Sequence, residues 1–499
     1  MLRSRDEGEG GEAAPVLRLT RADWLLENAR VLTLDPRRPV ARAIAIGGGR
    51  VLKLSSSARF DGETAAERID CRGATIVPGL IDPHLHLFAL AARRVNLDCG
   101  DAAIADVEGL LAAVRARAVG LPRDAWVRGE GLDETRLGRL PTAEELDAAA
   151  DGRPVRLRHR SRHASLLSTE ALRRLRGARA DSSGVIAGRE DLLGRVVGPL
   201  PPDAFAGALA AAATDLAAFG VTTVADATPH ARRELAPLDD VMGAGRFALR
   251  VVAMRRVGVR TWPAPDRLLP GPIKILVEED GAGLRPRPAI LARRIARAAA
   301  AGQVAVHCVG ASTLIAALAG FAALPRAARV GRRHRLEHVA ECPPPLVRRI
   351  AALGLGVVTN PAFVHWRGDV YREETPGPAQ SWLYRAATLA RAGIPLAAGS
   401  DAPVVSENPW IAIAAARSRR TATGAVLGRA ERLGAAAALR LVTTGAAFLL
   451  HADDLGRLVP GGPADLAVVE PDPLRAPPDE VAATHVRLTL AAGARVWGA

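Results

Sequence analysis

Lysine and aromatic residues are scarce in this chain of 499 residues. Lysine occurs only twice, at Lys53 and Lys274, so arginine supplies almost all of the positive charge. Aromatic residues make up 3% of the sequence, and no basic helix or known nucleic-acid motif accompanies the formal net charge of +14. Nucleic-acid recognition depends on clustered basic residues and often on stacking aromatic rings. The composition therefore argues against a nucleic-acid partner, and the scattered arginines indicate a genome-wide preference for arginine over lysine.

Cysteine is also rare, and its four copies lie far apart. Without a Cys-x-x-Cys pair, the sequence suggests neither a disulfide framework nor a zinc site made of cysteines. The first residues are charged and glycine-rich where a secretion signal needs an apolar core, and no run of 18 or more apolar residues is free of charge. We therefore expect a cytoplasmic protein without a membrane partner. With 49% apolar residues, the chain can bury a large core.

Short apolar runs at both ends of the chain predict β-strands. Residues 1–21 are rich in glycine and glutamate and predict a disordered extension. The runs in 22–75 are separated by Pro-Arg-Arg-Pro and Gly-Gly-Gly, and similar runs return in 455–499. Because neither set is long enough for a core of its own, we expect both to form one composite β-sandwich domain.

Between these ends, over residues 76–454, apolar strands alternate with helices rich in alanine, leucine and arginine. This α/β alternation is typical of βα units around a parallel sheet, and eight such strands most simply close into a (β/α)₈ TIM barrel. The strands are expected at 74–77, 221–225, 248–253, 273–277, 304–307, 335–338, 356–359 and 395–400. The stretch of about 90–205 is too long for one connection, so we expect an inserted subdomain that covers the barrel mouth.

The segment Pro78-Gly79-Leu80-Ile81-Asp82-Pro83-His84-Leu85-His86 is the most informative motif. Side chains at i and i+2 of a strand point to the same face, so His84 and His86 can reach one point. Imidazole is a favoured ligand of zinc and its first-row neighbours, and two such ligands leave positions open for water. Taken alone, the pair is also compatible with two unrelated surface histidines.

Further candidate ligands stand at the ends of later predicted strands. Barrel chemistry occurs at the carboxyl ends of the strands, where His307, His338 and Asp401 fall. Each histidine taken alone is more often a core residue than a ligand. Together with His84 and His86, they favour a metal centre at one mouth.

Lys274 lies inside an apolar strand, in a chain that uses arginine nearly everywhere. Burial disfavours the charged ammonium group and lowers its pKa, so the amine can react in its neutral form. With CO₂ it would form a carbamate, an anionic ligand able to bridge two cations. The alternative is a lysine on an edge strand whose charged end reaches solvent.

These ordered motifs resemble those of the amidohydrolase superfamily. The motifs are PGLIDPHLH, Lys274, His307, RLEHV, GSDAP and GRLVPGGPADLAVVE, and they are most similar to the YtcJ-like branch, amidohydrolase family 3, which includes N-substituted formamide deformylase. The resemblance runs from about residue 22 to the C-terminus. It implies a barrel, a composite β-domain and one or two divalent metal ions, usually zinc. By motif match, the metal-site residues are His84, His86, Lys274, His307, His338 and Asp401, with Lys274 a candidate for N-carboxylation.

We expect hydrolysis of an amide-type, non-peptide C–N bond by metal-activated hydroxide. Asp401 would take the proton of the attacking water and deliver it to the leaving nitrogen. Two alternatives stay open: a single-metal deaminase of the same superfamily, and a catalytically silent barrel used for binding. Lys274 argues against the first, and the complete set of ligand types argues against the second.

Four residues are candidates for binding a small-molecule substrate. Arg162 and His163 in the insertion can hold a carboxylate or carbonyl group, with plain surface charge as the equal alternative. His365 and Trp366 follow the seventh predicted strand, on a loop expected to overhang the mouth. The insertion has Ser161-Arg162-His163 where many relatives carry Asp-Gly-His, so a relative's substrate does not transfer. A homodimer is possible, but the sequence does not fix the oligomeric state.

Overall fold

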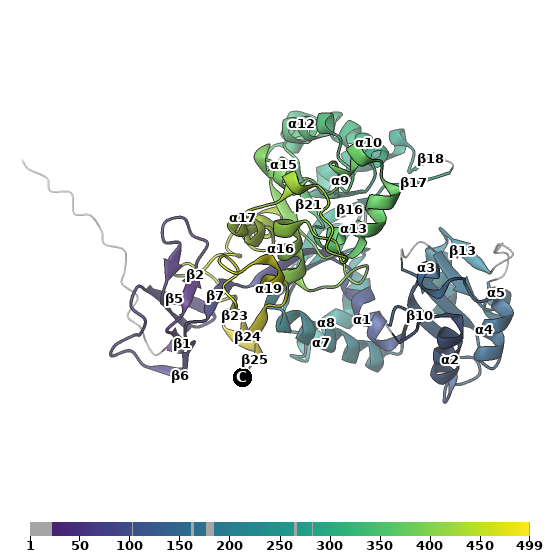
Figure 1. Cartoon of the computed structure of the whole chain (residues 1–499), viewed down its shortest axis with the longest axis horizontal. Coiled ribbons are helices and arrows are strands. Elements are labelled where there is room, and N and C mark those ends of the chain that lie inside the picture. The colour runs from purple at the N-terminus through teal and green to yellow at the C-terminus, as the bar shows by residue number, and fades with distance from the viewer. Residues whose placement is uncertain are drawn as a thin grey trace, which may run out of the picture.

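The computed structural model describes residues 22–101, 103–160, 164–175, 184–263, 267–281 and 283–498. The extension predicted at 1–21 and the candidate residues Arg162 and His163 lie outside this part of the chain. Figure 1 shows three groups of elements: a set of strands formed by both chain ends, a central barrel, and a smaller unit beside the barrel. Among the described residues, no helix combines the length and the apolar character needed to cross a membrane.

Eight parallel strands form the central sheet, and their spatial order is their order in the chain. They are β8 (Leu80–Leu85), β14 (Val221–His230), β15 (Arg250–Arg255), β16 (Leu268–Leu276), β19 (Val304–Cys308), β20 (Arg335–His338), β21 (Gly356–Thr359) and β22 (Leu396–Ala398). Just beyond the two end strands, Asp401 N donates to His84 O, and His86 N donates to Ala402 O, each at 2.8 Å. These bonds join the first strand to the last, so the predicted barrel is confirmed.

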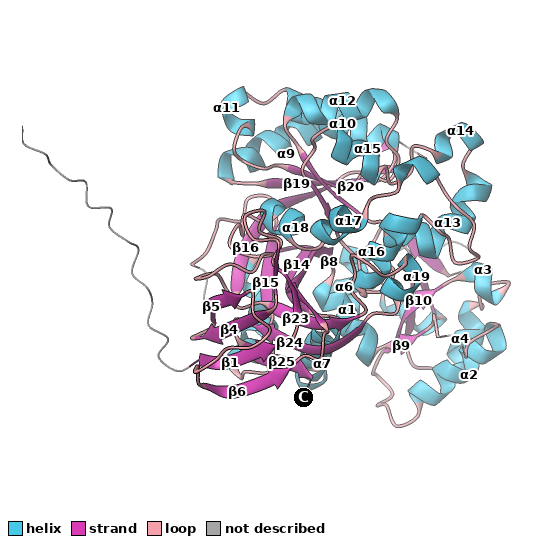
Figure 2. Cartoon of the chain, turned by 60° about the vertical axis from the view of Figure 1, so that its left-hand side comes forward, coloured by secondary structure: helices cyan, strands magenta, loops and turns pink. Residues whose placement is uncertain are grey.

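Helices follow the strands and cover the outside of the barrel (Figure 2). The longer ones are α1 (Leu87–Val95), α7 (Pro202–Ala218), α8 (Ala236–Gly243), α9 (Pro288–Ala301), α10 (Ala311–Ala322), α12 (Pro344–Leu353), α13 (Ala362–Glu374) and α16 (Pro409–Ser418). Their apolar faces and the strands share the largest core of the molecule. Because helices cover its outer face and side chains fill its interior, β14 is buried without interruption from Val221 to Ala227, and such strands read as continuous apolar runs.

A second sheet combines strands from both ends of the chain. Its order is β25-β24-β23-β7-β2-β3, so β7 (Thr75–Pro78) lies between β2 (Arg30–Leu32) and β23 (Leu466–Glu470). The other strands are β3 (Val40–Ala41), β24 (His485–Ala491) and β25 (Ala494–Gly498). A four-stranded sheet shares one apolar core with it and consists of β1 (Ala22–Glu27), β4 (Ala43–Gly47), β5 (Arg50–Ser55) and β6 (Ala65–Asp70). These pairings support the proposed composite domain of 22–75 and 455–499.

The start of the barrel differs from the prediction. Residues 74–77, expected as its first strand, enter β7 of the composite sheet, and the barrel begins at β8. Pro78 cannot donate to a ladder, and a Cβ at Gly79 would overlap the side chain of Thr222. The chain leaves the composite sheet at Pro78-Gly79 and enters the barrel at Leu80. The sequence did not reveal this change because the residues on both sides of it are apolar.

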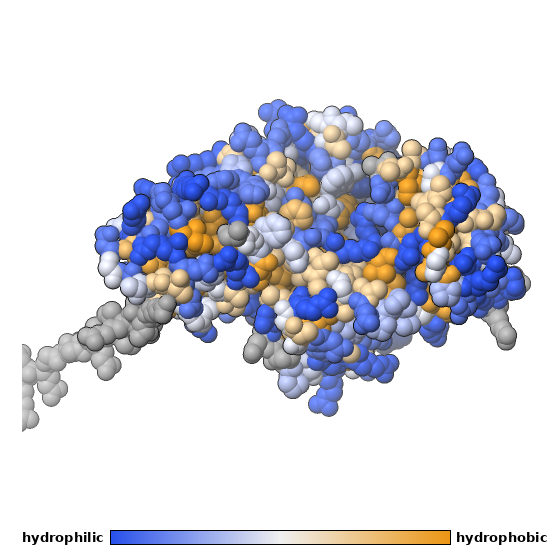
Figure 3. Space-filling model, turned by 90° about the horizontal axis from the view of Figure 1, so that it is seen from below, coloured by the Kyte–Doolittle hydropathy of each residue, from blue (hydrophilic) through white to orange (hydrophobic). Residues whose placement is uncertain are grey.

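The residues between α1 and α7 form a sheet with a core of its own. Its order is β13-β12-β11-β10-β9, and its strands are β9 (Leu97–Asp98), β10 (Val127–Leu132), β11 (Val155–His159), β12 (Ala164–Leu167) and β13 (Val185–Ala187). Helices α2 (Val107–Ala118) and α4 (Ala143–Ala149) contribute apolar side chains to that core. The subdomain predicted after the first barrel strand is thus present, and it lies at the right of Figure 1. Seen from below, the molecule is mainly hydrophilic, with apolar side chains in scattered patches (Figure 3).

Candidate metal centre

The barrel brings most of the predicted ligands to the carboxyl ends of its strands. His84 lies buried in β8, and His86 is the residue that caps the start of α1. His338 ends β20, His307 lies near the end of β19, and Asp401 follows β22. Parallel strands end at the same mouth of a barrel, so these five side chains come from positions where they can meet.

The distances show that they do meet. His84, His338 and Asp401 each offer one ligand atom, and these atoms lie within 4.8 Å of one another. Asp401 Oδ1 is 3.4 Å from Nε2 of His84 and 3.3 Å from Nε2 of His86. The rings of His307 and His338 have centroids 4.6 Å apart. Four imidazoles and one carboxylate therefore converge, which is a donor set suited to zinc or a similar cation.

A buried carboxylate fixes the orientation of His84. The Nδ1–H of His84 donates to Glu337, which also accepts a 2.6 Å hydrogen bond from Arg335. Burial would raise the pKa of Glu337, but the charges of Arg335 and His84 outweigh it and hold that pKa below its usual range. Glu337 is therefore ionised and accepts from Nδ1 of His84, so Nε2 is the ring atom that remains to bind a metal. That atom is buried and has no hydrogen-bond partner among the described residues, as expected of an atom that ligates a metal.

His338 is held by an amide in the same way. Its Nδ1 lies 2.8 Å from Oδ1 of Asn360, and Nδ2 of Asn360 donates to Gly399 O at 2.8 Å. Since the amide oxygen accepts, His338 carries its proton on Nδ1 and has its lone pair on Nε2. Burial lowers the pKa of His338 to about 4, so this ring is neutral near pH 7. Nδ1 of His86 lies 3.0 Å from Oγ1 of Thr228.

Lys274 lies buried on β16 beside these groups. Burial lowers its pKa, and the charges of Glu337 and Asp401 oppose that shift only in part. Burial lowers the pKa of His307, and the charges of His338 and Lys274 lower it further. The lysine thus acts on the centre electrostatically, and its burial makes the neutral amine easier to reach.

Two of the predicted ligands have left-handed backbone conformations. The φ angle is 70° at His338 and 61° at Asp401. Residues other than glycine avoid this region because Cβ crowds the neighbouring carbonyl, and they keep it only where their surroundings hold them there. Here the hydrogen bond from Asp401 N to His84 O holds the second of them. The strand ends are therefore shaped to present these two side chains.

The secondary structure predicted at His365 and Trp366 was wrong. They were expected on a loop, but both lie in α13, which begins directly after Pro361. Proline after Asn360 suggests a loop, yet proline also suits the start of a helix because its fixed φ is helical. The Trp366 side chain is 47% exposed and lines a cavity of about 740 Å³. His365 is half-buried, and its ring centroid is 5.1 Å from that of Trp366.

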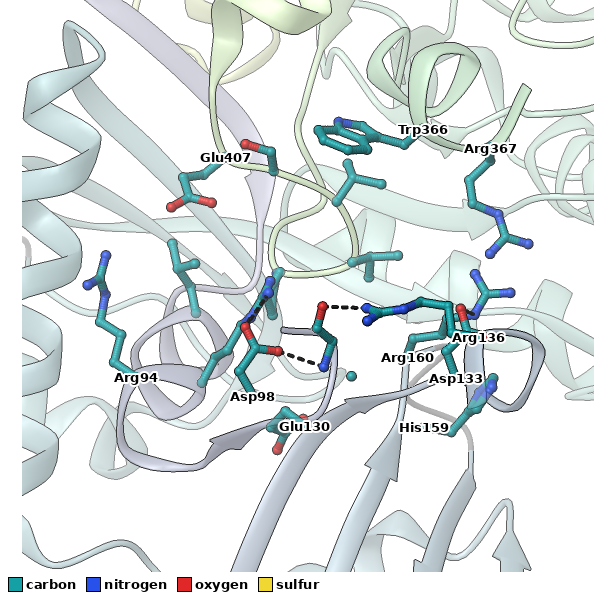
Figure 4. A pocket seen from close by; sticks show the side chains of 18 residues that line it. Arg94, Asp98, Glu130, Asp133, Arg136, His159, Arg160, Trp366, Arg367 and Glu407 are labelled. Carbon is teal, nitrogen blue, oxygen red and sulfur yellow. Dashed lines mark hydrogen bonds and ion pairs between the residues drawn. The ribbon is translucent and has the colours of Figure 1, made fainter. Parts of the chain in front are cut away.

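This cavity, the mouth cavity from here on, lies between the insertion and the barrel (Figure 4). One wall comes from α1, beginning one turn after His86 at Leu90. Another comes from Pro403–Glu407, which starts two residues after Asp401. The mouth cavity is thus lined in part by the residues that follow two of the proposed ligands, His86 and Asp401.

Several residues around the centre were not predicted from the sequence. Glu337 and Asn360 hold two of the imidazoles, and Asp82 accepts hydrogen bonds from His84 N at 3.0 Å and Ser400 N at 3.2 Å. One signal was available for Glu337: it stands with Arg335 directly before the candidate ligand His338, in a strand whose four residues are all buried. Two charges in a fully buried strand are rare unless they serve a site.

Comparisons with known proteins point to one family and one fold. The profile of the amidohydrolase family matches residues 67–497. N-substituted formamide deformylase of Arthrobacter pascens is 28% identical, over 94% of this chain and 97% of its own. The amidohydrolase YtcJ of Bacillus subtilis is 26% identical, over 87% of this chain and 91% of its own. In fold, the chain is similar to an uncharacterized metal-dependent hydrolase from Pyrococcus horikoshii, with a TM-score of 0.75, 22% identity, and coverage of 91% and 99% of the two chains.

Proposed function

Because the chain belongs to the amidohydrolase family, hydrolases that act on carbon–nitrogen bonds other than peptide bonds, we propose that it hydrolyses an amide-type bond of a small molecule at its barrel mouth. One observation carries this proposal. Nε2 of His84 is buried without a hydrogen-bond partner among the described residues, within the group that also contains His338 and Asp401. A purely structural histidine would have this atom satisfied, whereas a metal ligand would not.

The proposed metal-site residues are His84, His86, Lys274, His307, His338 and Asp401. Zinc is the proposed cation because imidazole and carboxylate ligands suit it. An N-carboxylated Lys274 would allow two cations, and its burial and lowered pKa support that form. Bound there, the cation supplies Lewis acidity toward a water and toward the carbonyl oxygen of the substrate.

Asp401 is the proposed proton carrier. Burial would raise the pKa of Asp401, but the neighbouring imidazoles of His84 and His86 hold that pKa well below its usual range. The carboxylate is therefore ionised and can accept the proton of the attacking water. It then returns this proton to the leaving nitrogen, which must be protonated because an amide anion is a very poor leaving group.

The alternatives differ in observable ways. A deaminase of the same superfamily would use one cation and release ammonia from a ring substrate. A silent barrel would bind ligands without turning them over. The unpartnered Nε2 of His84 and the complete set of ligand types favour the hydrolase over the silent barrel.

The test uses protein reconstituted with zinc, with metal content measured per chain. N-formyl and N-acetyl benzylamine, a urea and a lactam are offered beside amino-substituted nucleobases. Release of benzylamine with formate or acetate supports the proposal. Ammonia from a nucleobase, with one metal per chain, would support the deaminase. Absence of turnover of all these compounds by fully metallated protein counts against the hydrolase.

A further inference from the structure

The mouth cavity is unusually rich in arginine, and four of its five arginines are already satisfied. Arg93 pairs with Asp98 at 2.6 Å, and Arg160 pairs with Asp133 at 2.9 Å. The remaining partners are Asp215 for Arg94, and the backbone carbonyls of Gly100, Asp101 and Ile104 for Arg136. These four side chains build the walls, and each is already held in place by groups of the protein.

Arg367 is the exception. Among the described residues it has neither an ion pair nor a hydrogen bond, although it is half-buried and lines the cavity. Figure 4 shows its guanidinium group directed down toward the insertion residues Arg136 and Arg160. A cation that faces other cations and has no counter-ion is stabilised by an anion placed between them.

The acidic residues of the cavity do not supply this anion. Asp98 and Asp133 are paired with Arg93 and Arg160, and Glu130 accepts a 3.4 Å hydrogen bond from Asn96. Glu407 also lacks a partner among the described residues, but in Figure 4 it is drawn on the other side of the Trp366 ring. The anion must therefore come from outside the described part of the chain.

Trp366 defines the rest of the ligand. Its ring is 47% exposed and borders the cavity beside Arg367, with Val404 and Val405 among the apolar lining residues. An exposed indole of this kind binds flat apolar groups, and an arginine binds a carboxylate through two parallel hydrogen bonds.

We propose that Arg367 binds a carboxylate of the substrate while Trp366 packs against an aromatic part of the same molecule. The substrate class is then N-acylated aromatic compounds that carry a carboxylate away from the bond to be cleaved. The reaction part of this statement rests on the proposed function, but the binding part does not require hydrolysis.

The first experiment measures binding alone. Phenylacetate and its neutral counterpart phenylacetamide are titrated calorimetrically into the zinc-loaded protein and its variants. Arg367→Gln should weaken phenylacetate binding about 10- to 100-fold, the usual effect of losing a charge-assisted hydrogen bond, and leave phenylacetamide unchanged. Arg367→Lys should lose less than Arg367→Gln because it keeps the charge but not the fork of two donors.

The matched control is Arg372→Gln, on the same helix, where the arginine lies 4.0 Å from Asp369 and does not line the cavity. This variant should bind both probes like wild type. Glu407→Gln should bind phenylacetate at least as well as wild type, because it removes a repelling charge. Unchanged phenylacetate affinity in Arg367→Gln would mean that the carboxylate binds elsewhere, including on the metal, and would overturn the proposal. Failure of phenylacetate to bind the wild type would overturn it as well.

The second experiment separates this inference from the proposed function. Hydrolysis of N-formylphenylalanine and N-formylphenethylamine, which differ by the carboxylate, is compared by kcat/KM. The wild type should prefer the first about 10- to 100-fold, and Arg367→Gln should remove most of this preference. If both compounds are hydrolysed at equal kcat/KM, the proposed hydrolysis stands and the proposed role of Arg367 is wrong. The expected binding pattern without turnover retains the role of Arg367 and rejects the hydrolase.

Discussion

Gly399 leaves no room for a side chain against His84. A Cβ at position 399 would lie 2.6 Å from Cβ of His84 and 2.9 Å from its carbonyl oxygen. The carbonyl of Gly399 also accepts the hydrogen bond from Asn360, which in turn meets His338. The absence of a side chain here thus sets how closely the last barrel strand approaches the first, at two of the proposed ligands.

Gly399→Ala should displace His84 and weaken the centre. The backbone atoms it would strike cannot move aside as a flexible side chain can, so we expect zinc affinity to fall at least about 10-fold, with a lower thermal midpoint. Isothermal titration with zinc and thermal unfolding measure both effects. Gly207→Ala is the control, because no atom lies within 4 Å of that site in α7, and alanine there should add up to about 1 kcal/mol of stability. Wild-type zinc affinity in Gly399→Ala would show that this contact does not position His84.

Glu337→Gln should lower zinc affinity about 10- to 100-fold, because the carboxylate that keeps the proton of His84 on Nδ1 loses its charge. Glu431→Gln is the matched control: Glu431 is also buried, pairs with Arg385 at 3.4 Å and lies outside the centre. Both variants should lose stability, but only Glu337→Gln should lose metal. Equal zinc affinities in the two variants would assign Glu337 a role in folding alone.

Lys274→Arg should lose at least one metal ion and most activity. Guanidinium stays protonated and cannot form the bridging carbamate. The other lysine of the chain provides the control, since Lys53 is half-exposed and pairs with Glu63 at 2.7 Å, so Lys53→Arg should behave like wild type. Elemental analysis and turnover at added bicarbonate measure the difference. Undiminished metal content and rate in Lys274→Arg would favour a single-metal centre.

His84→Ala and His86→Ala should each remove metal and nearly all activity while the barrel stays folded. Loss of a group that orients a ligand lowers zinc affinity about 10- to 100-fold, and loss of a ligand itself should lower it further. The fold should persist because the large apolar core does not depend on one imidazole. Circular dichroism and metal analysis report the two properties separately. His485→Ala, an exposed site on β24, should change neither. Normal metal content in either ligand variant would refute the proposed centre.

The sequence predicted the barrel well because its strands are buried on both faces and appear as apolar runs. The histidines and the aspartate could be proposed as ligands for a related reason: each directly follows or ends such a run, whereas Lys274 lies inside one. The start of β8 could not be placed, because the change of sheet at Pro78-Gly79 depends on contact with Thr222, far along the chain. Likewise, the pairing of Glu337 with His84 and the lack of a partner for Arg367 depend on which residues meet in space.

The position of β7 between β2 and β23 has a consequence for synthesis of the protein on the ribosome. Nearly 400 residues separate β7 from β23, so one edge of β7 stays unpaired until the end of the chain emerges. At about 5–20 residues per second, this delay lasts about 20–80 s. Unpaired strand edges promote association between chains. During translation this edge therefore stays open to association, and chains that stall before residue 466 should aggregate through it.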